Sequence, residues 1–299
     1  DIKLVRSIPE LAFSRDGKFF SPTGDGKQDT LTFSARVTSS DDLETAELKI
    51  YDTARRLVRT FTFKGTLPDS VVWDGKNDAG TVEGDGLYEA QLVVNYRNGN
   101  MLQKDIPGIR LDGQPPAGSL TVAPAVFTPD GDGENDVLFL NVNLRDFTGI
   151  KDWRLAVFKK GDSQPFRTFT GEGGRTVAQL INWDGKSADG QDTVDAVEDY
   201  IVRLDAVDNL GNRMPTIEKD FTVGVLVEKT PRGLRIRVSS IVFATDSANL
   251  AQGSNDKLNK VIYILRRILS DPGKYGLTSN ARILISGHTD DVGPADYNK

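Results

Sequence analysis

The chain has 299 residues, 38% hydrophobic and 27% charged, which suits two or three globular domains and argues against disorder. It contains no cysteine, so disulfides, thiol catalysis and thiolate metal sites are excluded for these residues. No apolar run is long enough to span a bilayer and no signal peptide is visible, so the sequence shows no membrane attachment. No dense Lys/Arg run with interleaved aromatics is present, so no nucleic-acid partner is expected.

The net charge of −6 is unevenly distributed along the chain. Residues 226–299 carry a net charge of +4, and the remainder carries −10. A mildly basic end favours an anionic polymer as partner, although charges that only solvate a surface explain the same count more simply.

Two sequence anchors recur in the first two-thirds of the chain, and such a repeat organises the fold. Residues 19–37 read FFSPTGDGKQDTLTFSARV and residues 126–144 read VFTPDGDGENDVLFLNVNL, with matched positions 107 residues apart. The motif Trp-Asp-Gly-Lys at 73–76 returns at 183–186, a shift of 110 residues. The order and the nearly constant offset predict a duplicated module.

Each copy has the pattern of a β-sandwich. Apolar residues alternate with polar ones over 31–37 and 88–94, the period of half-buried strands, and Gly/Asp turn signals separate the runs. Many short strands in about 100 residues indicate two packed sheets. We expect Trp73 and Trp183 to fill equivalent positions between the sheets, and a linker over 111–120 marked by two prolines.

These two units resemble the immunoglobulin-like modules of the flagellar hook-capping protein and of bacterial surface proteins. The resembling residues are the S/T-P-x-G-D-G-x-x-D start and the W-D-G-K-x-x-x-G turn of each copy. The resemblance implies spacer or interaction modules rather than catalysts.

One Asp/Gly run also has the oxygen spacing that calcium uses, through Asp130, Asp132 and Asp136. It lacks the EF-hand order, and the first copy has Thr23 in place of Asp130. We favour a tight turn in which Asp side chains accept backbone N–H bonds and Gly residues take positive φ. We therefore assign no metal site and no cofactor, and expect any calcium effect to be small and confined to the second copy.

The pattern changes after residue 222. Alternating runs at 223–227 and 234–238, joined by 228–233, predict a hairpin. A helix capped by Ser254 or Asn255 should follow, ending at Pro272-Gly273, and residues 282–286 predict a short strand. The apolar face expected for that helix consists of Leu258, Val261, Ile262, Leu265, Ile268 and Leu269.

Residues 239–250 (SSIVFATDSANL), the helix, and residues 283–298 (ILISGHTDDVGPADYN) resemble the OmpA-like peptidoglycan-binding domain. The resemblance implies that Asp290 binds the ammonium of a diaminopimelate or similar stem peptide, with Thr289 and Asn298 shaping the pocket. The family's later Arg, which binds the carboxylate of the same group, has no match in these 299 residues. We therefore expect weak binding by these residues alone, since a ligand carboxylate would lack its partner. Capping of a following helix is the alternative for Asp290, and the favoured role for Asp291.

The sequence thus predicts a multidomain protein: two all-β immunoglobulin-like sandwiches, 1–114 and 115–224, and a partial α/β OmpA-like domain, 225–299. We expect a non-catalytic envelope protein in the periplasm of a diderm bacterium, which binds peptidoglycan and has an envelope protein as a further partner. The alternative is a structural or protein-interaction protein whose OmpA-like domain no longer binds the wall. No catalytic residues are assigned: the single histidine, His288, has no Ser or Cys nucleophile placed beside it.

Overall fold

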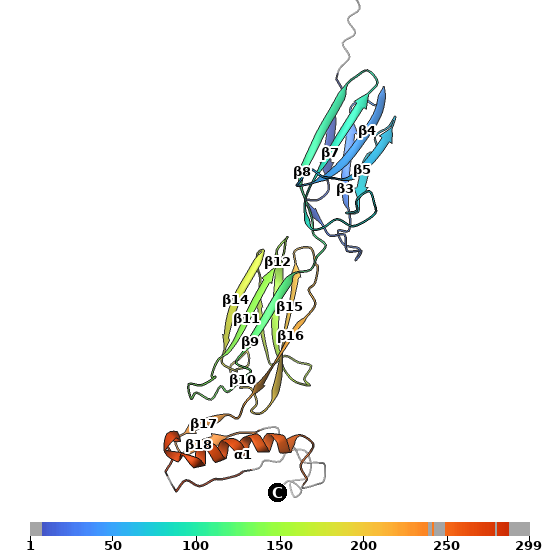
Figure 1. Ribbon diagram of the computed structural model, residues 1–299. Coiled ribbons are helices and arrows are strands. Elements are labelled where there is room, and N and C mark those ends of the chain that lie inside the picture. Colours follow the sequence, from blue (N-terminus) through green and yellow to red (C-terminus); the bar gives the residue numbers. More distant parts are fainter. Residues whose placement is uncertain (1–7, 239–240, 242–248, 279, 287–299) are drawn as a thin grey trace, which may run out of the picture. The chain divides into compact units, whose positions relative to one another are not determined.

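The computed structural model describes residues 8–238, 241, 249–278 and 280–286, which are mostly β-strand (Figure 1). By internal contacts the chain divides into two compact units. One is Asp1–Val122 with Phe139–Trp183 and Ile201–Asp220, and the other is Ala123–Leu138 with Asp184–Tyr200 and Phe221–Lys299. This division crosses the second pair of sheets, so the ranges 1–114, 115–224 and 225–299 stay predictions.

The first sandwich consists of two sheets. Its strands are β1 (Leu11–Arg15), β2 (Phe19–Phe20), β3 (Leu31–Val37), β4 (Leu43–Asp52), β5 (Leu57–Lys64), β6 (Ser70–Trp73), β7 (Gly86–Tyr96) and β8 (Met101–Leu111). One sheet has the order β1-β3-β6 and the other β2-β8-β7-β4-β5. Neighbouring strands are antiparallel except β2, which pairs parallel with β8.

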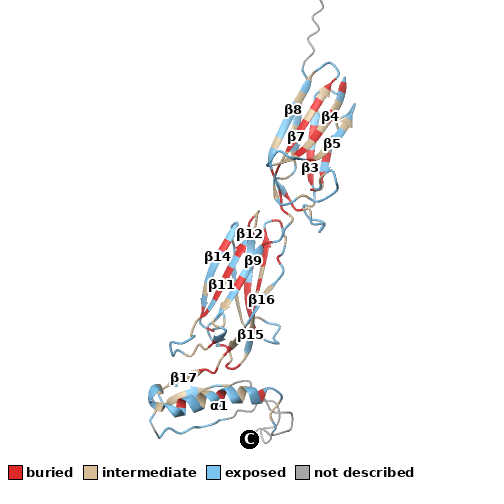
Figure 2. Cartoon of the chain, viewed as in Figure 1, coloured by how far each residue is buried: buried red, intermediate tan, exposed pale blue. Residues whose placement is uncertain are grey.

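The alternation read from the sequence fixes which side chains enter this core. Along β3, Leu31, Phe33 and Ala35 are buried between more exposed neighbours, as predicted, and β7 repeats the pattern (Figure 2). Both sheets contribute to one hydrophobic cluster, in which the Trp73 ring lies 5.1 Å from Phe20 and 5.3 Å from Tyr88. Burial of the apolar side chains in this cluster is the main stabilising term of the module.

The second set of sheets repeats this topology strand for strand. Its strands are β9 (Ala117–Ala123), β10 (Val126–Phe127), β11 (Leu138–Arg145), β12 (Ile150–Lys159), β13 (Arg167–Gly171), β14 (Thr176–Trp183), β15 (Asp199–Asp208) and β16 (Ile217–Val223). The orders are β14-β11-β9 and β10-β16-β15-β12-β13, the same as in the first set. Trp183 ends β14 as Trp73 ends β6, and both are buried, at 3% and 0% exposure. The predicted duplication and the equivalent tryptophans are confirmed.

In each copy the Trp-Asp-Gly-Lys turn is in contact with the opening Asp/Gly motif. Gly75 has φ of 76°, and a Cβ placed on it would lie 2.8 Å from Cγ of Pro22. In the second copy a Cβ on Gly185 would lie 2.9 Å from Cγ of Pro129. The Trp-Asp-Gly-Lys turn therefore packs on the Pro of the opening motif, and only Gly fits that contact.

The linker between the two sets is shorter than predicted. β8 runs to Leu111 and β9 already begins at Ala117, so only residues 112–116 connect them. Leu120, placed in the linker by the sequence, is a buried strand residue at 3% exposure. Pro115 and Pro116 directly precede β9 and do not lie in the middle of a longer linker.

The end of the chain contains a hairpin and a helix. β17 (Val227–Thr230) pairs antiparallel with β18 (Gly233–Ile236), which confirms the hairpin but with a tighter turn than predicted. Residues 228–230 are strand rather than loop, and Val223 instead ends β16. A tighter turn leaves fewer backbone groups to be satisfied outside the ladder.

Helix α1 (Ser254–Ser270) confirms the predicted helix, and a 3₁₀ turn, η1 (Pro272–Tyr275), follows it. The predicted cap is wrong: Gly253 is the N-cap, in a left-handed conformation, and makes no side-chain cap bond. The apolar face is also narrower than expected, since Val261 and Ile268 are buried while Ile262 and Leu269 are 41% and 45% exposed.

The strand predicted over 282–286 does not form. These residues have no strand assignment, and Leu284 and Ile285 are 89% and 86% exposed. A strand requires a partner for its backbone groups, and the described strands provide none to this segment. Among the described residues, no helix combines the length and the apolar character needed to cross a membrane.

Candidate functional site

The peptidoglycan-binding residues implied by the resemblance lie outside the described residues. Thr289, Asp290 and Asn298 all fall in 287–299, as does His288. The assignment of these residues therefore stays a prediction. The described residues bear on the other candidates, which are the Asp/Gly turns of the two sandwiches and their acidic side chains.

The opening Asp/Gly turns are built alike in both copies. Asp29 accepts from the backbone N–H groups of Gly24 and Gly26, at 2.6 and 2.7 Å. Asp136 accepts from those of Gly131 and Gly133, also at 2.6 and 2.7 Å. These carboxylates stabilise turns whose glycines have positive φ, as the turn interpretation predicts.

Asp130 stands where the first copy has Thr23. Its Oδ2 accepts from the backbone N–H of Val227 at 2.8 Å, while its buried Oδ1 has no partner among the described residues. Burial raises the pKa of this half-buried carboxyl group. Asp130, Asp132 and Asp136 each bring one oxygen within 4.8 Å of the others, but Asp132 is exposed and Asp136 already accepts three backbone bonds. The structure therefore gives this group a mainly structural role.

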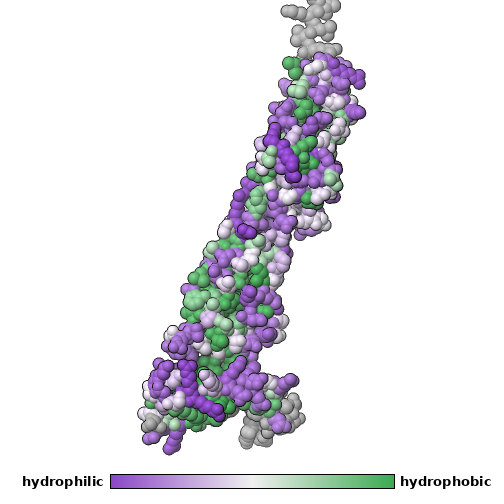
Figure 3. Space-filling model, in the orientation of Figure 1, coloured by the Kyte–Doolittle hydropathy of each residue, from purple (hydrophilic) through white to green (hydrophobic). Residues whose placement is uncertain are grey.

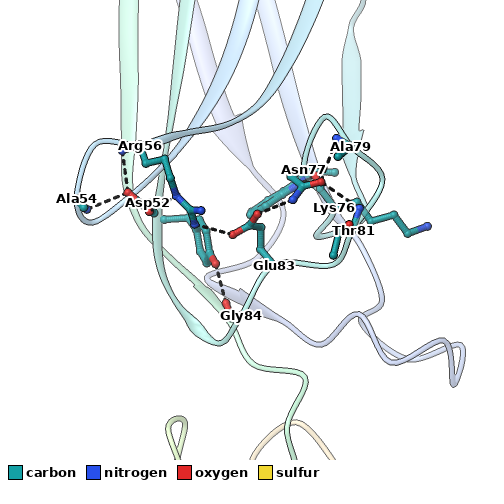
Figure 4. Close-up of polar contacts among 11 residues, drawn as sticks. Asp52, Ala54, Arg56, Lys76, Asn77, Ala79, Thr81, Glu83 and Gly84 are labelled. Carbon is teal, nitrogen blue, oxygen red and sulfur yellow. Dashed lines mark hydrogen bonds and ion pairs between the residues drawn. The ribbon is translucent and has the colours of Figure 1, made fainter.

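A second polar network connects the β4–β5 turn to the loop after β6 (Figure 4). Asp52 accepts from the backbone N–H groups of Ala54 and Arg56 and from Nε of Arg56. Nη2 of Arg56 reaches Glu83 at 3.0 Å, and the other oxygen of Glu83 accepts from Nδ2 of Asn77 at 2.9 Å. The backbone N–H of Arg56 is the main cause that lowers the pKa of Asp52. Because every member has a partner, this network holds the two loops together.

A further acidic cluster is formed by Asp112, Asp146 and Asp208, none of which was predicted as a site residue from the sequence. The three residues come from separate segments, so no local motif marks them. The available signal was weak: Asp146 and Asp208 each stand at a strand end, three residues before a glycine. The same pattern is common in turns without any ligand.

Comparison with known proteins gives structural matches only. No protein-family model and no curated protein matches the chain. The fibronectin(III)-like modules of CbhA from Clostridium thermocellum align at 15% identity and TM-score 0.29, over 71% of this chain and 94% of that one. A structure from a 1.5-MDa bacterial ice-binding adhesin, studied for host cell surface retention, aligns at 14% identity and TM-score 0.37. That alignment covers 73% of this chain and 66% of the adhesin structure. At these low scores, the assignment of immunoglobulin-like β-sandwich modules rests on the repeated strand orders.

Proposed function

We propose that this protein is a non-catalytic component of the bacterial cell envelope that binds peptidoglycan through an OmpA-like C-terminal domain. The observation that carries the proposal is the Gly287-His288-Thr289-Asp290 run, with Gly293 and Asn298 downstream, following a helix. The β17–β18 hairpin and helix α1 precede this run, as the resemblance implies, although the strand expected over 282–286 is not formed. The proposed location is the periplasm.

In this proposal Asp290 reads the ammonium of a zwitterionic stem-peptide residue such as diaminopimelate. A carboxylate paired with an ammonium and a guanidinium forked onto a carboxylate would recognise the two ends of that group. Thr289 and Asn298 would shape the pocket around it. The net charge of +4 on residues 226–299 is compatible with an anionic polymer.

The two sandwiches serve in this proposal as spacers or interaction modules. The repeated motifs are used to build the modules: Gly75 packs on Pro22, and Asp29 satisfies backbone groups of its own turn. Such use of the motif residues supports a structural role for the modules rather than a catalytic one.

The experiment is sedimentation of the full-length protein with purified peptidoglycan. Asp290→Ala should weaken binding about tenfold to hundredfold, the worth of one charge-assisted hydrogen bond. Asp291→Ala, next to it and of the same charge, is the matched control and should matter less. Equal sedimentation of the wild type and Asp290→Ala would show that the site is wrongly assigned.

The rival function is a protein-interaction role in which the wall is not bound. One observation favours it: Phe139 on β11 and Leu180 on β14 are 45% and 57% exposed on neighbouring strands of one sheet. Figure 3 shows hydrophobic residues at the surface over this part of the chain. Exposed aromatic and aliphatic side chains on a sheet face suit a protein partner. If the unaltered full-length protein does not sediment with peptidoglycan, the protein-interaction role is favoured.

A further inference from the structure

Asp112, Asp146 and Asp208 converge from three segments of the chain. Asp112 directly follows β8, Asp146 directly follows β11, and Asp208 is the last residue of β15. One carboxylate oxygen of each lies within 4.8 Å of the other two. Two of the three residues, Asp112 and Asp208, are fully buried at 0% exposure.

Backbone bonds fix the positions of the Asp146 and Asp208 carboxyl groups. Oδ1 of Asp146 accepts from the backbone N–H groups of Thr148 and Gly149, at 2.9 and 2.7 Å. Oδ1 of Asp208 accepts from those of Leu210 and Asn212, both at 2.8 Å.

Asp112 is the least satisfied member of the cluster. Its Oδ2 accepts from the backbone N–H of Thr148 at 3.1 Å, but its buried Oδ1 has no hydrogen-bond partner among the described residues. In the described part of the chain, no Lys or Arg forms an ion pair with Asp112, Asp146 or Asp208. A buried carboxylate beside two others requires neutralisation by a proton or a cation.

The electrostatics around Asp112 agree with this geometry. Burial is the main cause that raises the pKa of Asp112 to about 7; a hydrogen bond with Thr148 opposes the rise, and the charges of Asp146, Asp85 and Asp208 add to it. A positive ion at the cluster would offset the repulsion among these carboxyl groups.

We propose that Asp112, Asp146 and Asp208 bind a calcium ion. The donors are all hard oxygens, which calcium prefers, and no His or Cys is present to favour a transition metal. Two oxygens on one calcium, each about 2.4 Å from it, lie at most about 4.8 Å apart. The three oxygens meet that limit, and an ion there would neutralise the buried carboxyl group of Asp112, one oxygen of which has no hydrogen-bond partner among the described residues.

Calcium suits the cluster better than magnesium. Magnesium requires near-ideal octahedral geometry and retains several waters, whereas calcium accepts six to eight ligands in irregular arrangements. Carboxylates contributed by a linker and by two strand ends form an irregular set. Asp130, Asp132 and Asp136 are weaker candidates, because Asp132 is exposed, whereas Asp112 and Asp208 are fully buried.

The test is calorimetric titration of the whole chain with calcium chloride after removal of metal by EDTA. The wild type should bind one ion at this cluster, and Asp112→Asn should abolish that binding. Asp112→Asn keeps the shape and an oxygen for the Thr148 N–H, so circular dichroism should show a folded variant. Asp132→Asn is the matched control from the other cluster and should leave the binding unchanged.

Thermal unfolding provides the second readout. At a calcium concentration 100 times Kd, the ratio of folded to unfolded protein should rise about 100-fold for the wild type and not for Asp112→Asn. Absence of calcium binding by the wild type would overturn the proposal and identify Asp112 as a plain buried acid neutralised by a proton. Loss of binding in Asp132→Asn but not in Asp112→Asn would overturn it as well. Equal stabilisation by magnesium would overturn the assignment to calcium.

Discussion

At the scale of single residues, the contact between Gly75 and Pro22 joins the two repeated motifs of the first sandwich. Gly75→Ala would place Cβ 2.8 Å from Cγ of Pro22 at a φ of +76°, so both overpacking and backbone strain oppose it. We expect a loss of about 2–4 kcal/mol in the free energy of unfolding of that sandwich, measured by urea denaturation.

Gly80→Ala is the control for that substitution. Gly80 has a φ of +82° but no atom within 4 Å of an added Cβ, so it should lose only the roughly 1–2 kcal/mol of left-handed strain. If both variants lose the same stability, the contact with Pro22 contributes nothing. Gly185→Ala should reproduce the larger effect in the second copy, where the added Cβ meets Pro129 at 2.9 Å.

The phenol of Tyr88 gives the first sandwich a sensitivity to alkaline pH. Its OH donates to the carbonyl of Gly84 at 2.6 Å, and burial raises its pKa to about 12 from the ordinary value of 10.0. Since the folded pKa is the higher one, this stabilisation is fully present below about pH 10 and is lost as pH rises toward 12.

Tyr88→Phe should therefore lower stability relative to the wild type more at neutral pH than at alkaline pH. At pH 7 it should lose about 0.5–1.5 kcal/mol, the net worth of one hydrogen bond, while the ring contact with Trp73 remains. Above about pH 10 the gap to the wild type should narrow, because Phe has no proton to lose. Urea denaturation at pH 7 and at pH 11 measures both effects, and a constant gap would contradict the assignment.

Among the helices and strands, those features that depend on local sequence pattern were predicted correctly. Two-residue alternation located β3 and β7, and the repeated motifs located equivalent turns, because side-chain burial and positive φ are local requirements. The sequence-based prediction was wrong where structure depends on a neighbouring strand. Residues 282–286 have the alternation of a strand but pair with none of the described strands. It also failed at the start of α1, where Gly253 turns the chain without a capping side chain.

Helix α1 offers a test of which apolar residues hold it. Ile268 is 3% exposed and its neighbour Leu269 is 45% exposed, although the sequence pattern placed both on the buried face. Ile268→Ala should lose about 2–4 kcal/mol of stability because it leaves a cavity, and Leu269→Ala should lose under about 1 kcal/mol. Hydrogen exchange over 254–270 measures the difference, and equal protection in both variants would contradict the burial pattern.

Across the whole molecule, the candidate sites fall into two groups according to how far apart their residues lie in the sequence. The Asp/Gly turns and the 287–298 run are contiguous, so a sequence motif can mark them. Asp112, Asp146 and Asp208 meet only after β8, β11 and β15 have formed, and each alone looks like an ordinary turn residue. A cluster assembled by topology is therefore invisible to motif reading, which is why these three residues were not among the candidates predicted from the sequence.

The spacer role proposed for the sandwiches predicts that wall binding does not depend on the first of them. Residues 11–111 form both sheets of that sandwich and its own hydrophobic cluster, so their removal takes away a complete module. A deletion variant that lacks residues 8–111 and keeps the rest of the protein should sediment with peptidoglycan as well as the wild type. Asp290→Ala in the undeleted protein should lose about tenfold or more in affinity for peptidoglycan. The two variants separate the roles, because one removes length and the other removes a single carboxylate. Equal losses in both would mean that the first sandwich itself contacts the wall or a wall-bound partner, and the spacer role would then be wrong.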